Sequence, residues 1–218
     1  MAVHDVLSRE QIDAELATLP GWRFRLGGLA AVLKCPTSAL ALELLATIGE
    51  LAQKANHHPD VDWRYDTLFV ALSSHDAGSR VTARDAALAK SISAAGKDVG
   101  AVEEPSRLRS LEITMDTDNI EAIAPVWAAA LGFVAGAPDD LRDPASRLPT
   151  LWFQQTATPN ANRFHLDIYV PASEAHKVLA AVEEAGASLD RSHAPSFVIA
   201  TDAQGNRLCI CSEEGRDA

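Results

Sequence analysis

Residues 36–76 read PTSALALELLATIGELAQKANHHPDVDWRYDTLFVALSSHD, and this stretch decides the fold of the first half of the chain. Its first part carries apolar residues at helical spacing, which predicts a long helix that runs to about Asn56. Pro59 disfavours helical backbone in the residue before it, so the chain should become extended there. The next two segments, residues 61–65 and 67–73, predict two strands joined by a tight turn.

The flanking segments continue this alternation of helices and strand pairs. Ser8 is a good N-cap with Gln11 three residues on, which predicts a first helix that ends at Pro20-Gly21. The other predicted elements are strands at 22–26 and 29–34 and a helix at 83–95. Because the strands arrive as hairpins, we expect an antiparallel sheet with helices packed on one face, which is an α+β fold.

The second half of the chain contains an internal echo of a strand, a helix and further strands. The first copy is predicted at 111–117, 119–131 and 151–155, and the second at 164–170, 173–184, 197–200 and 207–211. Such a duplication predicts paired βαβββ-type modules arranged with two-fold symmetry around a shared groove. Residues 96–109 show little periodicity and are interpreted as a linker. We therefore predict one domain at 1–100 and a second at 107–214.

The composition excludes some classes of partner. The 218 residues carry a net charge of −11, which argues against a large basic face for nucleic acid. No apolar run approaches the ~18 residues of a membrane helix, and the first residues show no secretory signal. Three cysteines, an odd number, fit a reducing compartment better than a disulfide framework. We therefore expect a cytoplasmic protein that binds neither nucleic acid nor membrane.

Histidines mark the candidate site of the first domain. His57 and His58 are adjacent, and imidazole has an unperturbed pKa of roughly 6.5, which suits proton transfer near neutral pH. His75 follows at the predicted end of a strand that returns toward the pair, and Asp85 lies at the start of the next helix. A carboxylate near an imidazole fixes its orientation and favours its protonated form. The alternative is a set of unrelated surface histidines with an ordinary helix-start aspartate.

These residues belong to a pattern that resembles the pterin-4a-carbinolamine dehydratases over roughly residues 3–98. The matching pieces are Leu19-Pro20-Gly21-Trp22, Ala55-Asn56-His57-His58-Pro59-Asp60, Trp63, Tyr65, Leu72-Ser73-Ser74-His75-Asp76 and Arg84-Asp85. The resemblance implies dehydration of a 4a-hydroxytetrahydropterin to a quinonoid dihydropterin, a hydro-lyase reaction. It requires a proton delivered to the departing hydroxyl and a proton removed from a ring nitrogen, with no metal and no other cofactor.

The resemblance also implies roles for individual residues. The expected catalytic set is His57, His58 and His75, with Asp85 orienting one of the three, and His75 is our choice for the acid. The residues expected to bind the substrate are Pro59, Trp63, Ser74 and Asp76. Members of this family assemble through their helices, so a homo-oligomer, dimer or tetramer, is expected here.

The second domain resembles the glyoxalase-like (vicinal oxygen chelate) domains. The matching pieces are Val126-Trp127-Ala128-Ala129-Ala130-Leu131-Gly132, Asn162-Arg163-Phe164-His165-Leu166-Asp167 and Asp202-Ala203-Gln204-Gly205-Asn206-Arg207-Leu208-Cys209. By this resemblance Glu112 and His165 are weak candidates for metal ligands, but Arg207 stands where a glutamate is common. A guanidinium cannot ligate a metal, and two ligands are too few for a closed site. We therefore expect no metal here and consider an ion pair between Arg207 and Glu112 in its place.

Two other functions remain open on the sequence. The second domain could carry the main chemistry as a metal-dependent lyase or dioxygenase-like enzyme, with the first domain as an oligomerisation module. Alternatively, the chain could be a non-enzymatic binding protein that stabilises other dimers. We prefer the dehydratase hypothesis because its histidine set is complete.

Overall fold

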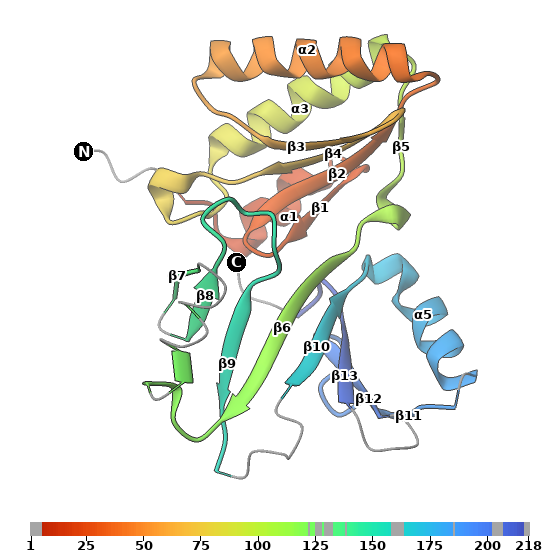
Figure 1. The fold of residues 1–218 in the computed structure, drawn as a ribbon. Helices are drawn as coiled ribbons and strands as arrows, with labels where there is room; N and C mark the ends of the chain where they lie inside the picture. Colours follow the sequence, from red (N-terminus) through yellow and green to blue (C-terminus); the bar gives the residue numbers. More distant parts are fainter. Residues whose placement is uncertain are drawn as a thin grey trace. The chain divides into compact units, whose positions relative to one another are not determined.

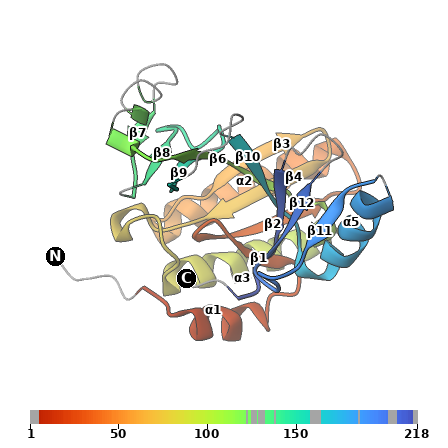
Figure 2. The same cartoon turned by 90° about the horizontal axis from the view of Figure 1, so that it is seen from below.

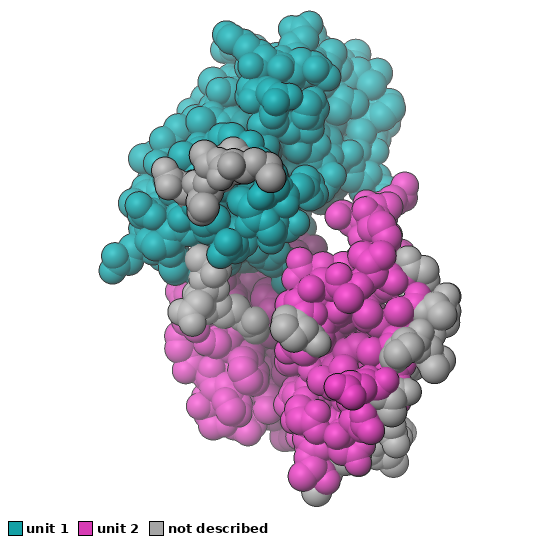
Figure 3. All heavy atoms as spheres, turned by 90° about the vertical axis from the view of Figure 1, so that its left-hand side faces the viewer, with its two compact units in different colours: residues 1–108, 216–218 teal, residues 109–215 magenta. Residues whose placement is uncertain are grey.

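The computed structural model places its elements as shown in Figures 1 and 2. The residues described are 6–121, 123–124, 128, 133–137, 139–157, 164–184, 186–201 and 207–215. The chain divides into two compact units at residues 108 and 109, coloured separately in Figure 3, and each unit is treated by itself below. In the described part of the chain, no helix has both the length and the apolar character needed to cross a bilayer.

The first unit is an antiparallel sheet. Its strands lie in the order β1 (Trp22–Arg25), β2 (Gly28–Lys34), β4 (Thr67–Leu72) and β3 (Asp60–Arg64), with β5 (Val102–Glu103) also paired to β2. Every pairing in this sheet is antiparallel, as hairpin connections require. The α+β prediction is therefore confirmed for this half of the chain.

Three helices cover one face of this sheet. They are α1 (Arg9–Leu16), α2 (Ser38–Ala55) and α3 (Ala83–Asp98), and Figure 1 shows α2 and α3 next to each other over the strands. Ile12, Leu44 and Ile92, one from each helix, belong to a single buried cluster with Leu33 and Leu68 of the sheet. Because one core receives side chains from all three helices, the helices share one face of the sheet.

The predicted linker at 96–109 is wrong in part. Helix α3 continues to Asp98, and the two residues of β5 then pair with Leu33 and Lys34 of β2, beyond the part of β2 that pairs with β1. A short 3-10 helix follows at Pro105–Arg107. A strand of two residues leaves no periodicity in the sequence, so only the structure reveals its partner.

The second unit is an eight-stranded sheet built from two modules. The first module contains β6 (Ser110–Thr117), β7 (Val134–Ala135), β8 (Asp140–Arg142) and β9 (Leu151–Gln155); the second contains β10 (Phe164–Tyr169), α5 (Ala172–Glu184), β11 (Ser188–Asp190), β12 (Phe197–Thr201) and β13 (Arg207–Cys211). In each module the first strand pairs in parallel with the last, and the two first strands, β6 and β10, meet antiparallel. This repeated register confirms the predicted duplication.

Helix α5 lies against one face of the second module (Figures 1 and 2). Its Leu179 belongs to one buried cluster with Val198 and Ile210. The helix predicted at 119–131 falls largely outside the described residues. The strands β7, β8 and β11 were not predicted, because runs of two or three residues carry no usable period.

The segment between β7 and β9 contains β8 and a turn held by Asp143. The carboxylate of Asp143 accepts backbone N–H groups from Ala145, Arg147 and Leu148. These hydrogen bonds, that from Ala145 first, lower the pKa of Asp143.

Candidate active site

His57 is held at the point where helix α2 stops. Asn56 ends the helix in the left-handed conformation, with φ of 46°, which asparagine tolerates better than most residues. The His57 N–H still donates to the carbonyl of Ala52 at 3.1 Å, and Pro59 then commits the chain to the extended backbone of β3. The backbone of His57 is thus fixed by the helix end and not by a free loop.

The hairpin of β3 and β4 brings Ser74 to the same place. The last pair in this ladder is Asp60 with Ala71. His57 lies three residues before the start of β3, and Ser74 lies two residues after the end of β4. The hairpin therefore brings the two residues to the same end of the sheet, where both contact Asp85.

Asp85 comes from the first turn of α3. Thr82 is the N-cap of that helix, and its N–H donates to Asp85 Oδ2 at 2.7 Å in a capping box. Ser74 forms a backbone bridge with Arg80, which ties the end of β4 to the segment that enters α3. The short connection between β4 and α3 therefore brings Ser74, Thr82 and Asp85 close together.

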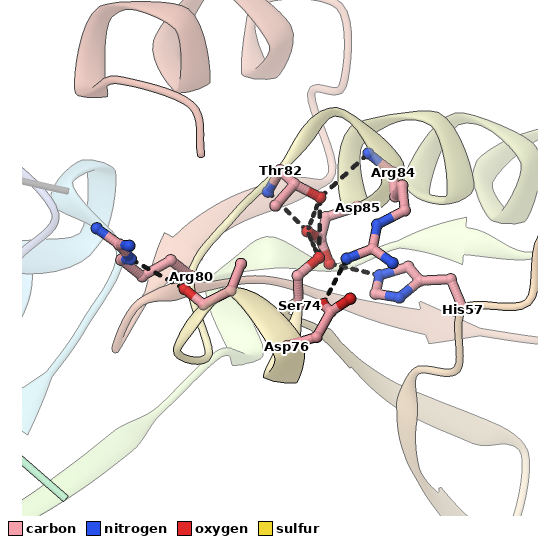
Figure 4. A network of polar contacts seen from close by, with 8 residues as sticks. His57, Ser74, Asp76, Arg80, Thr82, Arg84 and Asp85 are labelled. Atoms are coloured by element: carbon pink, nitrogen blue, oxygen red, sulfur yellow. Dashed lines mark hydrogen bonds and ion pairs between the residues drawn. The ribbon is translucent and has the colours of Figure 1, made fainter. Parts of the chain in front are cut away.

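The buried carboxylate of Asp85 is the centre of the resulting network, drawn in Figure 4. Asp85 is 0% exposed, and its Oδ1 lies 2.7 Å from Nε2 of His57, which is 7% exposed. Its Oδ2 lies 2.8 Å from Ser74 Oγ and 3.0 Å from Thr82 Oγ1, in addition to the Thr82 N–H. A buried charge is costly unless it is hydrogen-bonded, and here both oxygens have partners.

The donors and acceptors around Asp85 determine which atoms of the network carry a hydrogen. Ser74 Oγ and Thr82 Oγ1 lie 2.8 Å apart, and each hydroxyl has only one hydrogen to give. One hydroxyl can therefore donate to the other while the second donates to Asp85. With Asp85 ionised, Nε2 of His57 must carry the proton that it shares with the carboxylate, which leaves Nδ1 as the nitrogen able to accept a proton.

The remaining predicted residues lie around this network. His75 begins the short helix His75–Ala77 and is exposed, as is His58. The residues on either side of His75 are both tied to α3: Ser74 through Asp85, and Asp76 through an ion pair with Arg84 of 2.5 Å (Figure 4). The backbone of His75 is therefore held at the same edge of the unit as Asp85.

The structure separates the predicted site residues into two groups. His57, Ser74 and Asp85 share one network, whereas His58, His75 and Pro59 take no part in it among the described contacts. Ser74 is 0% exposed and its hydroxyl faces Asp85 and Thr82, so its visible role is to position the carboxylate. The direct substrate contact expected of Ser74 stays a prediction.

Sequence reasoning did not assign Thr82 and Arg84 to the site. Thr82-Ala83-Arg84-Asp85 is a capping box in the sequence, and this signal could have placed Thr82 beside the carboxylate. The aromatic residues of the first unit divide between the core and the surface. Trp22 is fully buried in the core, whereas Trp63 is 41% exposed on β3 and its Nε1–H donates to the carbonyl of Tyr65.

The second unit holds the weak metal candidates on one face of its sheet. Glu112 of β6 stands opposite Asp167 of β10, and His165 stands opposite Thr114, so all four side chains share a face. Arg207, the first residue of β13, is exposed. A set of Glu112, His165 and Arg207 does not fit a metal, because the guanidinium has no lone pair to offer. The ion pair of Arg207 with Glu112 stays a prediction.

Sequence comparisons agree with this division of the chain. Residues 5–95 match the family model described as pterin 4 alpha carbinolamine dehydratase. A protein of Mycolicibacterium smegmatis, provisionally named pterin-4-alpha-carbinolamine dehydratase, is 39% identical over 87 residues, which cover 40% of this chain and 92% of the relative. The chain belongs to the pterin carbinolamine dehydratase family. Its membership rests on the first unit, which carries the His57–Asp85 network.

The second half of this pterin carbinolamine dehydratase family member matches a different model, described as a glyoxalase-like domain, over residues 112–211. Two solved structures show weaker likeness. A transcriptional coactivator/pterin dehydratase from Brucella melitensis has a TM-score of 0.41 at 23% identity, and covers 42% of this chain and 99% of its own. A glyoxalase/bleomycin resistance protein/dioxygenase superfamily member from Vibrio splendidus has a TM-score of 0.34 at 9% identity, covering 49% and 100%. The family assignments therefore rest on the sequence matches.

Proposed function

We propose that the first unit dehydrates a 4a-hydroxytetrahydropterin to the quinonoid dihydropterin by histidine acid–base catalysis. The observation that carries the proposal is the 2.7 Å contact between Nε2 of His57 and the buried carboxylate of Asp85. A buried carboxylate on one ring nitrogen fixes the tautomer and the orientation of the ring, as in catalytic triads. Family membership supplies the substrate class.

In this proposal His57 is the base and Asp85 is a positioning residue. Nδ1 of His57 accepts the proton from a ring nitrogen of the pterin, and Asp85 stabilises the imidazolium that forms. Ser74 and Thr82 in turn hold Asp85 through its second oxygen. The small exposed fraction of His57 keeps water away from the pair, which strengthens its electrostatic coupling.

The second proton transfer goes to the leaving hydroxyl. His75 is the acid in this proposal, because it is exposed at the edge where Ser74 joins the network and two residues beside it are tied to α3. Its proton leaves with the 4a-hydroxyl as water, while His57 takes up one proton, so the two steps leave the charge of the substrate unchanged. His58, also exposed, is placed to exchange protons with solvent.

The test is the rate of pterin dehydration with a substrate generated in place by a pterin-dependent hydroxylase. His57→Ala and His75→Ala should each lower kcat/KM by roughly 10²–10⁴-fold, the usual contribution of general acid–base catalysis. His176→Ala, which removes an exposed histidine from α5, is the matched control and should leave the rate unchanged. Equal rates in all three variants would show that the site is assigned wrongly, and an inactive wild type would favour the binding-protein alternative.

A further inference from the structure

We propose that residues 99–108 form a strap that fastens the connection between the two units onto the first unit, and that the side chain of Glu103 holds this strap in place. The proposal goes beyond the dehydratase activity and does not depend on it. The strap lies outside both matched segments, 5–95 and 112–211. It contains β5 and the 3-10 helix Pro105–Arg107 (Figure 1), and it belongs to the first unit, which in this part of the chain ends at Leu108.

A chain of hydrogen bonds runs from the core of the first unit to Glu103. The indole Nε1–H of Trp22 donates to Ser93 Oγ at 2.8 Å, and the hydroxyl of Ser93 donates to Glu103 Oε1 at 2.6 Å. Trp22 and Ser93 are both buried. A serine hydroxyl has one hydrogen, and because Ser93 accepts from the indole, that hydrogen can go to the carboxylate. Glu103 therefore joins the strap to β1 and α3 at once.

The first unit leaves space for Glu103 by having no side chain at position 21. A Cβ added to Gly21 would lie 2.2 Å from Cδ and 2.5 Å from Cβ of Glu103, far inside ordinary contact distance. Gly21 does not adopt a positive φ, so a left-handed backbone is not the reason for a glycine here. The missing side chain instead permits the close approach of the strap.

Backbone hydrogen bonds hold the strap along β2. β5 pairs antiparallel with Leu33 and Lys34, beyond the part of β2 that pairs with β1. The N–H of Glu104 donates to the carbonyl of Val32 at 2.9 Å. An unpaired strand edge presents donors and acceptors that another chain can use. The strap satisfies this part of the β2 edge from within the same chain.

The end of the strap lies against the sheet face opposite the helices. Val32 is 0% exposed, although its neighbour Leu33 belongs to the helix-side core and successive side chains of a strand point to opposite faces. On the face of Val32, the guanidinium of Arg107 lies over the ring of Phe69, 5.7 Å from its centroid, and donates to Thr67 Oγ1 at 3.4 Å. A cation over an aromatic face is attracted to it. The strap is thus held on a sheet face as well as at an edge.

Fastening the strap shortens the tether between the two units. With the strap bound, Arg109 alone lies between the end of the first unit and β6, which begins at Ser110. With the strap released, the tether would consist of residues 99–109, which span up to about 36–40 Å at full extension. The strap therefore determines how far the second unit can move from the first.

The experiment is limited proteolysis of the full-length chain with trypsin, which cuts after lysine and arginine and therefore reports on the bond after Arg107 in the strap. A folded segment is cut when it opens locally, so the cleavage rate follows the population of the open state. We expect this bond to be cut far more slowly in the protein than in a synthetic peptide of residues 99–112. Equal rates in the protein and the peptide would overturn the proposal.

The variants test what holds the strap. Glu103→Ala removes the acceptor of the Ser93 hydroxyl and should raise the cleavage rate after Arg107 by roughly 10–100-fold, which corresponds to the loss of a hydrogen bond to a charged group. Gly21→Ala keeps Glu103 but fills the space that its side chain occupies, and it should raise the same rate. Asp98→Ala is the matched control, because it removes an exposed carboxylate at the end of α3, and it should leave the rate unchanged.

A second measurement separates release of the strap from unfolding of the first unit. Cleavage after Arg84 and Lys90 within α3 should stay slow in Glu103→Ala, and an equal rise at these bonds would contradict a local release. Hydrogen exchange of residues 99–108, measured by mass spectrometry, should become faster in Glu103→Ala and Gly21→Ala but not in the control. If Gly21→Ala does not fold, Glu103→Ala decides the test, and an unchanged cleavage rate in that variant would overturn the proposal.

Discussion

The network around Asp85 makes a strong prediction for the Asp85→Asn variant. In the wild type, Oδ2 of Asp85 accepts the Thr82 N–H, a group that can only donate, while Oδ1 faces His57 Nε2. An asparagine at this position has one oxygen and one NH₂ group. Its oxygen must turn to the Thr82 N–H, so its NH₂ group faces His57. Because two donors repel, His57 must then move its proton from Nε2 to Nδ1.

This change of tautomer determines how far the dehydration rate of Asp85→Asn should fall. The nitrogen proposed to accept the substrate proton is already protonated in the variant, so His57 loses its function as a base. The rate of dehydration should fall by roughly 10²–10⁴-fold, comparable to the loss when the carboxylate of a catalytic triad is made neutral. The stability cost should be smaller, about 1–3 kcal/mol, since charged hydrogen bonds are replaced by neutral ones at an unchanged shape.

The assay measures kcat/KM for dehydration across neutral pH together with unfolding in urea. Asp85→Asn should have a much lower kcat/KM than wild type. Its pH profile should also lack the part that depends on the protonation state of the base. Ser74→Ala is the matched control, because it removes a hydrogen bond to Asp85 while leaving the carboxylate on His57. It should cost about 1–2 kcal/mol of stability but keep the shape of the pH profile. If Asp85→Asn retains the wild-type rate and pH dependence, the proposed tautomer has no part in catalysis.

Three further predictions concern stability. Leu44 is fully buried on α2, and Leu44→Ala should lower the free energy of unfolding by about 2–5 kcal/mol, because a cavity replaces the side chain in the core. Unfolding in urea measures this loss. Trp22→Phe removes the hydrogen bond from Nε1 to Ser93 Oγ of 2.8 Å and leaves a cavity at a fully buried site, so it should cost more than the roughly 1 kcal/mol of the hydrogen bond alone in the same assay. The hydrogen bond from Lys34 is the main cause that lowers the pKa of Asp66 below its ordinary 3.8, so their interaction stabilises the fold above that pH and is lost as the pH falls through the lowered value. Lys34→Met should therefore be less stable than wild type at neutral pH, and this difference should shrink in acid; an equal difference at both pH values would rule out the linkage.

The first unit was predictable because its determinants are local. Helix periodicity, the N-cap at Ser8 and the stop at Pro59 each act over a few residues, and the structure places the elements where these signals predict them. The location of the candidate site was predicted from the same signals, because the β3–β4 hairpin begins just after the end of α2 and returns toward it. What sequence reasoning lacked was the direction of each side chain. The contact between His57 and Asp85 joins the end of α2 to the first turn of α3, and nothing in the sequence states how these two helices are placed against each other.

In the second unit, the decisive partner comes from a different part of the chain. The spacing of His165 and Asp167 shows that they share a face if the segment is a strand, and the same holds for Arg207 and Cys209. The parallel register of β10 and β13 determines which residues of the two strands stand beside each other. A helix and two other strands separate β10 from β13 in the sequence. A shift of two residues along β13 would place Arg207 beside Asp167, and the site would then be an ion pair. The observed register puts Cys209 there instead, so the residue beside Asp167 is a consequence of topology that composition and spacing alone leave undetermined.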